Sequence, residues 1–265
     1  MNTPRPSGSS TEAAPEPRIL TRDDGATIAY HRLAGRTPGV VFLTGFNSDM
    51  TGGKALALEA FCRKRGQAFV RFDYFGHGAS SGAFVDGTIG RWADDAVAVI
   101  DRLTEGPQVL VGSSMGGWIM LLAALAKPER IAGLVGTAAA PDFTEDLILN
   151  GLAPKQRADL ARHGYIETDN PYDDKPYRIT KALLDEGRNH LMLKAEIPLD
   201  CPVRLIHGTA DTDVPWRTSE RLALTLRSRD VETLFVKNGD HRLSEPKDLE
   251  RLARVVGRLL DQLQG

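Results

Sequence analysis

Cysteine, long apolar runs and an excess of charge are scarce or absent in this sequence, and each absence excludes a class of protein. Only Cys62 and Cys201 occur, without CxxC spacing, which favours reduced, buried thiols over a disulfide scaffold, although a stray disulfide stays an alternative. No uninterrupted apolar run approaches the ~20 residues of a membrane span, so no stable membrane insertion is expected. A formal net charge of −2 gives no reason to expect nucleic-acid binding.

The N-terminal segment 1–17 also lacks an apolar core and is rich in Pro, Ser, Thr and Ala, which predicts a disordered tail. It has no hydrophobic stretch typical of a secretory signal, and the acidic residues Glu12 and Glu16 argue against a transit peptide. We therefore expect a cytoplasmic protein. The histidines show no HExxH or similar ligand spacing, so neither a metal nor another cofactor is expected.

What the sequence does contain is an alternation of strand-like and helix-like segments. Strands are predicted within 18–33 (a hairpin turning at Asp24-Gly25), 39–46, 67–74, 108–112, 131–139, 201–208 and 231–237. Helices are predicted over 52–65, 88–103, 115–126, 217–227 and 246–263. This order indicates an α/β fold with a mostly parallel sheet covered by helices on both faces, and the opening hairpin would form its antiparallel edge.

One long segment interrupts the alternation. Residues 142–199 contain helical fragments around a Pro-, Tyr- and Asp-rich middle, and a segment this long between two strands is usually a functional insertion. We therefore expect an α/β core formed by 18–141 and 200–265, with 142–199 inserted as a lid or cap.

The pattern Gly-x-Ser-x-Gly occurs twice, centred on Ser80 and on Ser114. Ser114 follows a short apolar strand and precedes an apolar helix, which is the strand–turn–helix context of a nucleophile elbow. Ser80 lies in a glycine-rich loop with no helix directly behind it, which indicates an ordinary turn-rich connection. Ser113 lies one residue too early for the apex. The local context therefore predicts Ser114 as a nucleophile.

A serine nucleophile needs a base that an acid orients, and on such sheets the chain order is Ser, acid, His. His241 lies in the loop after the last strand, where the base is expected. Asp211 and Asp213 both follow the preceding strand, and their spacing alone does not decide between them as the acid. His207 ends that strand and is expected to shape the acid loop by hydrogen bonding.

An oxyanion hole for this chemistry needs two backbone N–H donors. The first donor is expected from Met115, the residue after the nucleophile. The second is expected from the loop after the 39–46 strand, where Phe46 is the preferred donor and Gly45 lets the chain bend.

With these residues placed, the chain from Thr21 onward resembles the α/β-hydrolases, through its elbow "GSSMGG", its loop "DYFGHGAS", its acid loop "HGTADTDVP" and its histidine loop "GDH". In that superfamily the first Asp of "HGxxDxxVP" is the acid, which implies Asp211. The stretches "GFNSDMTGGKALALEAFC", "RFDYFGHGASSG" and "VGSSMGGWIMLLAA" are similar to the abhydrolase-domain-ten group.

The resemblance implies an α/β-hydrolase fold and a serine hydrolase acting as a palmitoyl-protein thioesterase or acyl-glucuronide esterase, with a small-molecule ester, a thioester or an acylated protein as its partner. Animal members of that group are mitochondrial, whereas the tail here suggests a bacterial relative. Three cations are candidates to bind a glucuronide carboxylate, although a solvent-exposed surface role is the preferred interpretation for each: Arg178, Arg188 and Lys194. Four residues of the 142–199 segment are candidates to line a slot for the acyl chain, although a simple packing role is the preferred interpretation for each: Leu147, Leu149, Leu191 and Met192.

Several alternative functions stay open at this point. They are a short-chain carboxylesterase, a peptidase or a cofactor-free haloperoxidase on the same triad, and a non-catalytic binding protein on the same fold. A dinucleotide-binding oxidoreductase is disfavoured, because no helix begins at the third glycine of Gly76, Gly78 and Gly82 and the expected downstream acidic residue is missing. The oligomeric state is left open.

Overall fold

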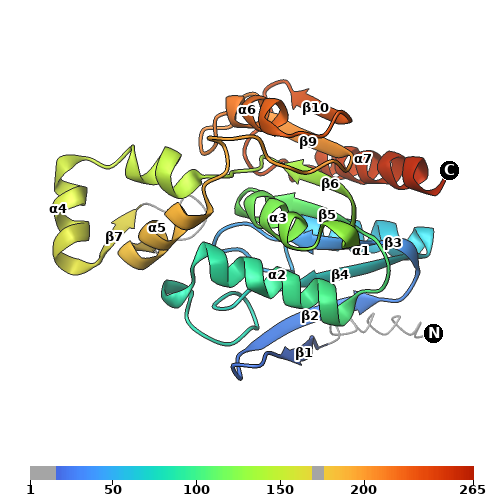
Figure 1. The fold of residues 1–265 in the computed structure, drawn as a ribbon, viewed down its shortest axis with the longest axis horizontal. Helices are drawn as coiled ribbons and strands as arrows, with labels where there is room; N and C mark the ends of the chain where they lie inside the picture. Colours follow the sequence, from blue (N-terminus) through green and yellow to red (C-terminus); the bar gives the residue numbers. More distant parts are fainter. Residues whose placement is uncertain (1–15, 169–175) are drawn as a thin grey trace, which may run out of the picture.

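The computed structural model describes residues 16–168 and 176–265 and contains a large twisted sheet with helices on both faces (Figure 1). The strand order is β1-β2-β4-β3-β5-β6-β9-β10. These strands are β1 (Arg18–Thr21), β2 (Thr27–Leu33), β3 (Arg36–Leu43), β4 (Gln67–Phe72), β5 (Gln108–Ser113), β6 (Ile131–Thr137), β9 (Val203–Gly208) and β10 (Val231–Val236). β1–β2 and β2–β4 pair antiparallel and all other neighbours pair parallel, so the predicted fold class is confirmed.

Helices close the sheet on each side. They are α1 (Gly53–Arg65), α2 (Ile89–Leu103), α3 (Met115–Ala126), α4 (Pro154–His163), α5 (Lys181–Gly187), α6 (Arg217–Thr225) and α7 (Pro246–Gln264). Trp92, Trp118 and Leu222 bury the α2, α3 and α6 side in one apolar cluster. Leu58 and Val256 bury the α1 and α7 side in a second cluster. The sheet is therefore the middle of three layers.

The central strands end together at one edge of the sheet, and this edge positions the site. Val41, Val109 and Leu110 have no exposed surface, as expected for apolar runs buried on both faces of a parallel sheet. Parallel strands present their carboxyl ends at the same edge. The loops that follow β3, β5, β9 and β10 therefore begin close to one another.

Residues 142–199, which we call the cap, lie between β6 and β9 and extend beyond the end of the sheet (Figure 1). Within the cap lie a π-helical turn η3 (Thr144–Leu149), α4, an antiparallel pair β7 (Tyr165–Thr168) and β8 (Tyr177–Thr180), α5 and a short turn η4 (Arg188–His190). The sequence predicted only helical fragments here, and the β7–β8 pair was missed. Most of the Pro-, Tyr- and Asp-rich middle lies outside the described residues, as does nearly all of the predicted tail.

The two ends of the cap are joined at its base. The buried carboxylate of Asp142 accepts hydrogen bonds from the backbone N–H groups of Met192 and Leu193, at 2.8 and 2.9 Å. Burial raises the pKa of Asp142, against the lowering effect of these two donors. A carboxylate that spans the entry and exit of the cap in this way keeps the two chains side by side.

Cys62 and Cys201 are not joined in a disulfide, and burial raises the pKa of their thiols to about 12 and about 11 respectively, so neither is a ready nucleophile. In the part of the chain that the structure describes, no helix is both long enough and apolar enough to cross a membrane.

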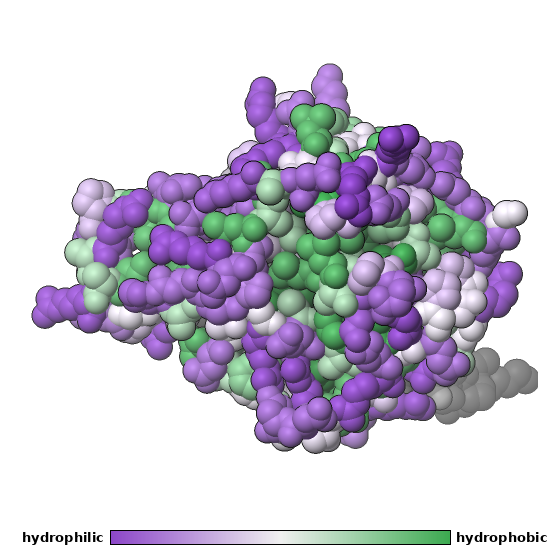
Figure 2. Space-filling model, viewed as in Figure 1, coloured by the Kyte–Doolittle hydropathy of each residue, from purple (hydrophilic) through white to green (hydrophobic). Residues whose placement is uncertain are grey.

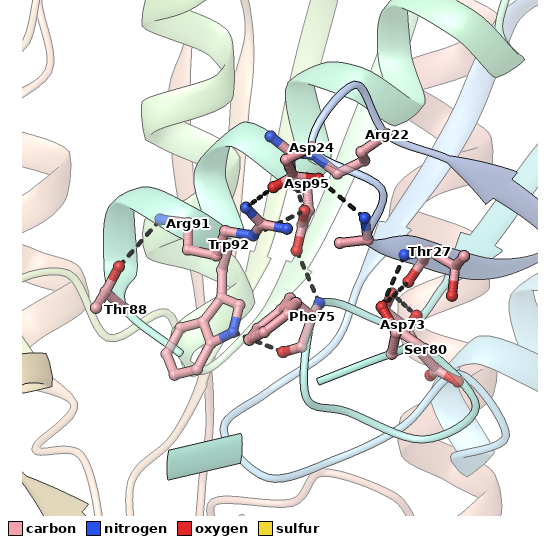
Figure 3. Close-up of polar contacts among 12 residues, drawn as sticks. Arg22, Asp24, Thr27, Asp73, Phe75, Ser80, Thr88, Arg91, Trp92 and Asp95 are labelled. Carbon is pink, nitrogen blue, oxygen red and sulfur yellow. Dashed lines mark hydrogen bonds and ion pairs between the residues drawn. The ribbon is translucent and has the colours of Figure 1, made fainter. Parts of the chain in front are cut away.

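The loop after β4 is anchored by a buried carboxylate, Asp95 of α2 (Figure 3). Asp95 accepts a hydrogen bond from the backbone N–H of Phe75 at 2.7 Å and pairs with Arg22, which precedes the opening hairpin turn. The indole N–H of Trp92 donates to the Phe75 carbonyl at 3.0 Å. α2 thus holds this glycine-rich loop in one conformation.

His77 lies in the same loop with 4% of its surface exposed, among the rings of Tyr74, Phe84 and Trp92. Its Nδ1 lies 3.1 Å from the carbonyl oxygen of Phe75, to which it donates in the neutral form. Burial lowers the pKa of His77 from 6.5 to about 4.

The lowered pKa of His77 predicts that the protein loses stability in mild acid. Between pH 6.5 and 4 the unfolded chain binds a proton at this position that the native protein does not, so unfolding becomes easier as the pH falls through that window. When His77 is fully titrated, the free energy of unfolding falls by about 3 kcal/mol, at about 1.36 kcal/mol per pKa unit. We expect His77→Asn, which keeps an N–H donor and does not titrate, to show a weaker decline of Tm from pH 6.5 to 4. Parallel Tm curves for the two proteins would contradict this assignment.

Candidate active site

Ser114 occupies a strained turn between β5 and α3. Its backbone has φ 54° and ψ −120°, a conformation that costs energy for any residue other than glycine and that marks functional turns. The turn needs glycines on both sides. A Cβ atom on Gly112 would lie 2.4 Å from the carbonyl oxygen of Gly116, and a Cβ on Gly116 would lie 2.1 Å from that of Leu43. The predicted elbow geometry is therefore present at Ser114.

The structure brings Ser114, His241 and Asp211 into one chain of hydrogen bonds. His241 Nε2 lies 3.0 Å from Ser114 Oγ, and His241 Nδ1 lies 2.8 Å from Asp211 Oδ2. The Asp211 side chain is fully buried, whereas that of His241 keeps 16% exposure. Since an ionised carboxylate only accepts hydrogen bonds, Nδ1 carries the proton in neutral His241 and Nε2 accepts from the Ser114 hydroxyl.

Of the two candidate acids, Asp211 is the one whose carboxylate hydrogen-bonds to His241. Its other oxygen, Oδ1, accepts from the backbone N–H groups of Asp213 and Val214, at 2.9 and 2.8 Å. Burial alone would raise the pKa of Asp211, but the hydrogen bonds from His207, His241 and Val214 outweigh it and hold that pKa well below its ordinary value. Asp211 is therefore ionised throughout the neutral pH range.

His207 supplies the hydrogen bond to the acid loop that its position suggested. The ring is fully buried at the end of β9, with Nε2 lying 3.0 Å from both Asp211 Oδ2 and the Val214 carbonyl. Its Nδ1 lies 2.7 Å from Ser219 Oγ on α6.

Ser80, the serine of the second motif, has a structural role in the loop after β4 (Figure 3). Its hydroxyl donates to the Asp73 carbonyl at 2.6 Å and accepts from the Ala29 N–H at 2.9 Å, which ties the loop to β2. Within the described ranges no histidine side chain hydrogen-bonds to this hydroxyl; His77 only accepts from the Ser80 backbone N–H through its carbonyl, at 3.0 Å. The turn-rich interpretation of this second motif agrees with these contacts.

Of the two expected oxyanion donors, Met115 directly follows Ser114 and Phe46 lies in a turn that passes beside it. Met115 begins α3, and the first N–H groups of a helix have no partner within it. Phe46 lies in a tight turn after β3, with Asn47 at φ 49° and the Ser48 N–H donating to the Gly45 carbonyl at 3.3 Å. A Cβ on Gly45 would lie 3.5 Å from Ser114 Cβ, so this turn passes directly beside the serine.

The Phe46 side chain joins the sheet layer to the cap. Its ring contacts Phe84 and Trp92 from the core and Phe143 and Tyr177 from the cap, with ring centroids 4.8 to 6.1 Å apart. All four contacts are edge-to-face, an arrangement that aromatic pairs favour. The residue expected to donate its N–H to an oxyanion is thereby held by rings on two sides.

A cavity of about 450 Å³ opens at Ser114 and His241, within the size range of small-molecule sites. The cap contributes an apolar group of lining residues: Phe143, Leu147, Ile148, Tyr177 and Ile179. The loop after β3, the start of α1, the acid loop and the histidine loop contribute a polar group: Asn47, Ser48, Asp49, Lys54, Asp213, Arg242 and Ser244. On the face shown in Figure 2, hydrophobic residues gather where the cap meets the rest of the molecule, within a hydrophilic surround. The cavity is therefore apolar on one set of walls and polar, with two cations and two carboxylates, on the other.

The four cap residues considered as the lining of an acyl slot have different positions in the structure. Leu147 lines the cavity. Leu149 and Met192 are buried in the apolar cluster and Leu191 packs against it, which is the preferred packing role.

The three cations weighed for a carboxylate lie elsewhere on the cap. Arg178 pairs with Glu167, Arg188 pairs with Glu145, and Lys194 is exposed; none of the three lines the cavity.

The cations that do line the cavity, Lys54 and Arg242, were missed by sequence reasoning. Lys54 donates to the backbone carbonyl of Arg242, and its pKa is lowered from 10.5 to about 8, first by burial and then by the Arg242 charge. No sequence pattern at the start of a surface helix distinguishes a cavity-lining lysine from an exposed one. Tyr177 and Ile179 were also missed, although the aromatic and β-branched runs "YIET" and "YRIT" are a strand signal.

Comparison with known proteins agrees with this geometry. The alpha/beta hydrolase family matches residues 40–255. Palmitoyl-protein thioesterase ABHD10, mitochondrial, is 42% identical in Bos taurus and 40% identical in Homo sapiens, over 92% of this chain and 80% of each relative. The structure of ABHD10 from mouse matches with a TM-score of 0.88 at 39% identity, covering 94% of this chain and 100% of that chain.

A bacterial structure is equally similar. The putative hydrolase from Agrobacterium vitis S4 matches with a TM-score of 0.89 at 40% identity, covering 92% of this chain and 98% of that chain. Est1E from Butyrivibrio proteoclasticus, at 21% identity and a TM-score of 0.77, shares the fold. A family match over most of the chain, close relatives at 40% identity and the strained serine turn agree: the chain belongs to the alpha/beta hydrolase family, in the same group as the ABHD10 proteins.

Proposed function

We propose that this protein is a serine hydrolase that cleaves acyl thioesters and carboxylic esters, with Ser114 as nucleophile, His241 as base and Asp211 as acid. The observation that carries the proposal is the hydrogen-bonded chain from Ser114 Oγ through His241 to Asp211 Oδ2, of which Ser114 and His241 line the cavity. The ABHD10 relatives, named as palmitoyl-protein thioesterases, support the thioester as substrate.

The mechanism follows from the order of these contacts. His241 Nε2 takes the proton of Ser114 Oγ while the oxygen attacks the substrate carbonyl, and Asp211 stabilises the imidazolium that forms. The N–H groups of Met115 and Phe46 hold the oxyanion. The leaving thiol or alcohol takes the proton from His241 as its bond to the acyl carbon breaks. Water then releases the acyl group from Ser114 by the same steps, with His241 again as base.

The cap residues of the cavity are proposed to hold the acyl chain. Phe143, Leu147, Ile148 and Ile179 offer apolar contact beside Ser114 without a charged group among them. A longer chain covers more of this wall and gains about 0.8 kcal/mol per buried CH₂. This favours long-chain acyl groups over the short-chain carboxylesterase alternative.

A second candidate is the hydrolysis of esters whose leaving group is anionic, such as acyl glucuronides. It is supported by Lys54 and Arg242, two cations that line the cavity together with the carboxylates Asp49 and Asp213. A carboxylate on the leaving group would be placed beside them while the acyl chain lies along the cap.

One set of kinetic measurements separates these substrates. We expect kcat/KM to rise with acyl length from butyryl to palmitoyl and to be higher for thioesters than for matched oxygen esters. Higher kcat/KM for acyl glucuronides than for uncharged esters of the same acid, lost in Lys54→Met, would favour the second candidate. Equal or falling kcat/KM with chain length would contradict the acyl role of the cap. The expected cytoplasmic location stays a prediction, since the relatives are named as mitochondrial.

A further inference from the structure

Two histidines share one oxygen of the proposed catalytic acid. His241 Nδ1 and His207 Nε2 lie 2.8 and 3.0 Å from Asp211 Oδ2. The role proposed above uses His241 alone. His207 is fully buried and has no route to the substrate, yet it contacts the same oxygen as the base does.

The partners of His207 determine where its proton lies. Because the Val214 carbonyl and the Asp211 carboxylate only accept hydrogen bonds, Nε2 carries a proton that both share. In the neutral ring Nδ1 then accepts from the Ser219 hydroxyl at 2.7 Å. Ser219 on α6 therefore holds the ring from behind and directs Nε2–H at the acid.

Asp211 is left with donors at each of its oxygens. Oδ1 accepts from the N–H groups of Asp213 and Val214, and Oδ2 accepts from His207 and His241. A carboxylate has about four lone-pair sites, so this set occupies them all and fixes the plane of the group.

We propose, building on the proposed function, that His207 is a positioning residue for the Asp211–His241 pair. Its Nε2–H holds Oδ2 where His241 Nδ1 meets it and withdraws part of the negative charge that this oxygen presents to His241. His207 thereby sets both the orientation and the basicity of the base.

The expected change in pH profile follows from that charge. Without the His207 donor, Oδ2 keeps more of its negative charge and stabilises the charged form of His241 more strongly. A base must be neutral to accept the Ser114 proton, and the acid limb of kcat/KM therefore moves to higher pH. The other charged groups around the pair (Asp213, Asp240, Arg242 and Lys54) are unchanged by the substitution.

The test compares His207→Leu with His207→Gln, whose amide N–H₂ can take the place of Nε2–H. We expect His207→Leu to lower kcat by about 10- to 100-fold with little change in KM, and to move the acid limb upward. His207→Gln should restore most of the rate and the wild-type limb. His77→Asn changes a buried histidine that does not line the cavity. It serves as the control, and we expect the acid limb of its kcat/KM profile to stay at the wild-type pH.

Failure of this inference is distinct from failure of the proposed function. A folded His207→Leu with wild-type kcat and acid limb overturns the positioning role, while Ser114 still reacts with a fluorophosphonate. Absence of both labelling and turnover in the wild type overturns the proposed function instead. If His207→Leu does not fold, Ser219→Ala decides: a smaller shift in the same direction supports the role, and an unchanged pH profile overturns it.

Discussion

Ser114→Ala is expected to lower kcat/KM by about 10⁴- to 10⁶-fold while leaving the fold intact, as loss of the nucleophile does in other serine hydrolases. The methyl group removes the Oγ that attacks the acyl carbon, and His241 is left without the proton it takes up. Residual turnover should persist, because binding and the Met115 and Phe46 amides still act on the substrate. Steady-state kinetics on a palmitoyl thioester, with Tm as the check of folding, measure this effect.

Ser80→Ala is the matched control, since Ser80 is the central serine of the other Gly-x-Ser-x-Gly motif. Loss of its hydrogen bonds to Asp73 and Ala29 should lower the free energy of unfolding by about 1 kcal/mol and leave kcat/KM per folded molecule near that of the wild type. The opposite pattern, an inactive Ser80→Ala beside an active Ser114→Ala, would refute the assignment of the nucleophile.

Asp211→Asn should have the second largest effect, a loss of about 10³- to 10⁴-fold in kcat. Each oxygen of Asp211 accepts from two donors, so asparagine in either orientation points its NH₂ group at two N–H groups. Where the NH₂ group faces the two histidines, His241 relieves its own clash by moving its proton from Nδ1 to Nε2. In that tautomer Nε2 is a donor and does not accept the Ser114 proton.

Asp213→Asn is the control for this change, because Asp213 has the same charge two residues away and donates only its backbone N–H to Asp211. We expect it to retain kcat within a few-fold. The two variants are compared by kcat and by the rate of fluorophosphonate labelling of Ser114. Equal losses in both would show that the loop, rather than the Asp211 carboxylate, supports the base.

Much of the fold was predictable because its signals are local. The apolar runs of β3 and β5 are too continuous for an exposed strand, and the helix at Met115–Ala126 follows directly from its apolar sequence before Lys127-Pro128. The Gly112 and Gly116 spacing identified the strained turn, since only glycine permits so close an approach of backbone to backbone. The β7–β8 pair in the cap was missed because its strands are four residues each and a Pro-, Tyr- and Asp-rich stretch of sequence separates them.

The sequence by itself determined the alternation of strands and helices, the mostly parallel sheet and the elbow, and it predicted the chain order of nucleophile, acid and base, because each depends on periodicity, on glycine at a tight turn or on position after a strand. It did not choose between Asp211 and Asp213 by spacing. Only the tertiary structure decided that Asp211 contacts His241, that His207 shares the same oxygen, and that Lys54 rather than Arg178 lines the cavity. Those facts are distances between side chains on separate elements, which packing sets and no local pattern records.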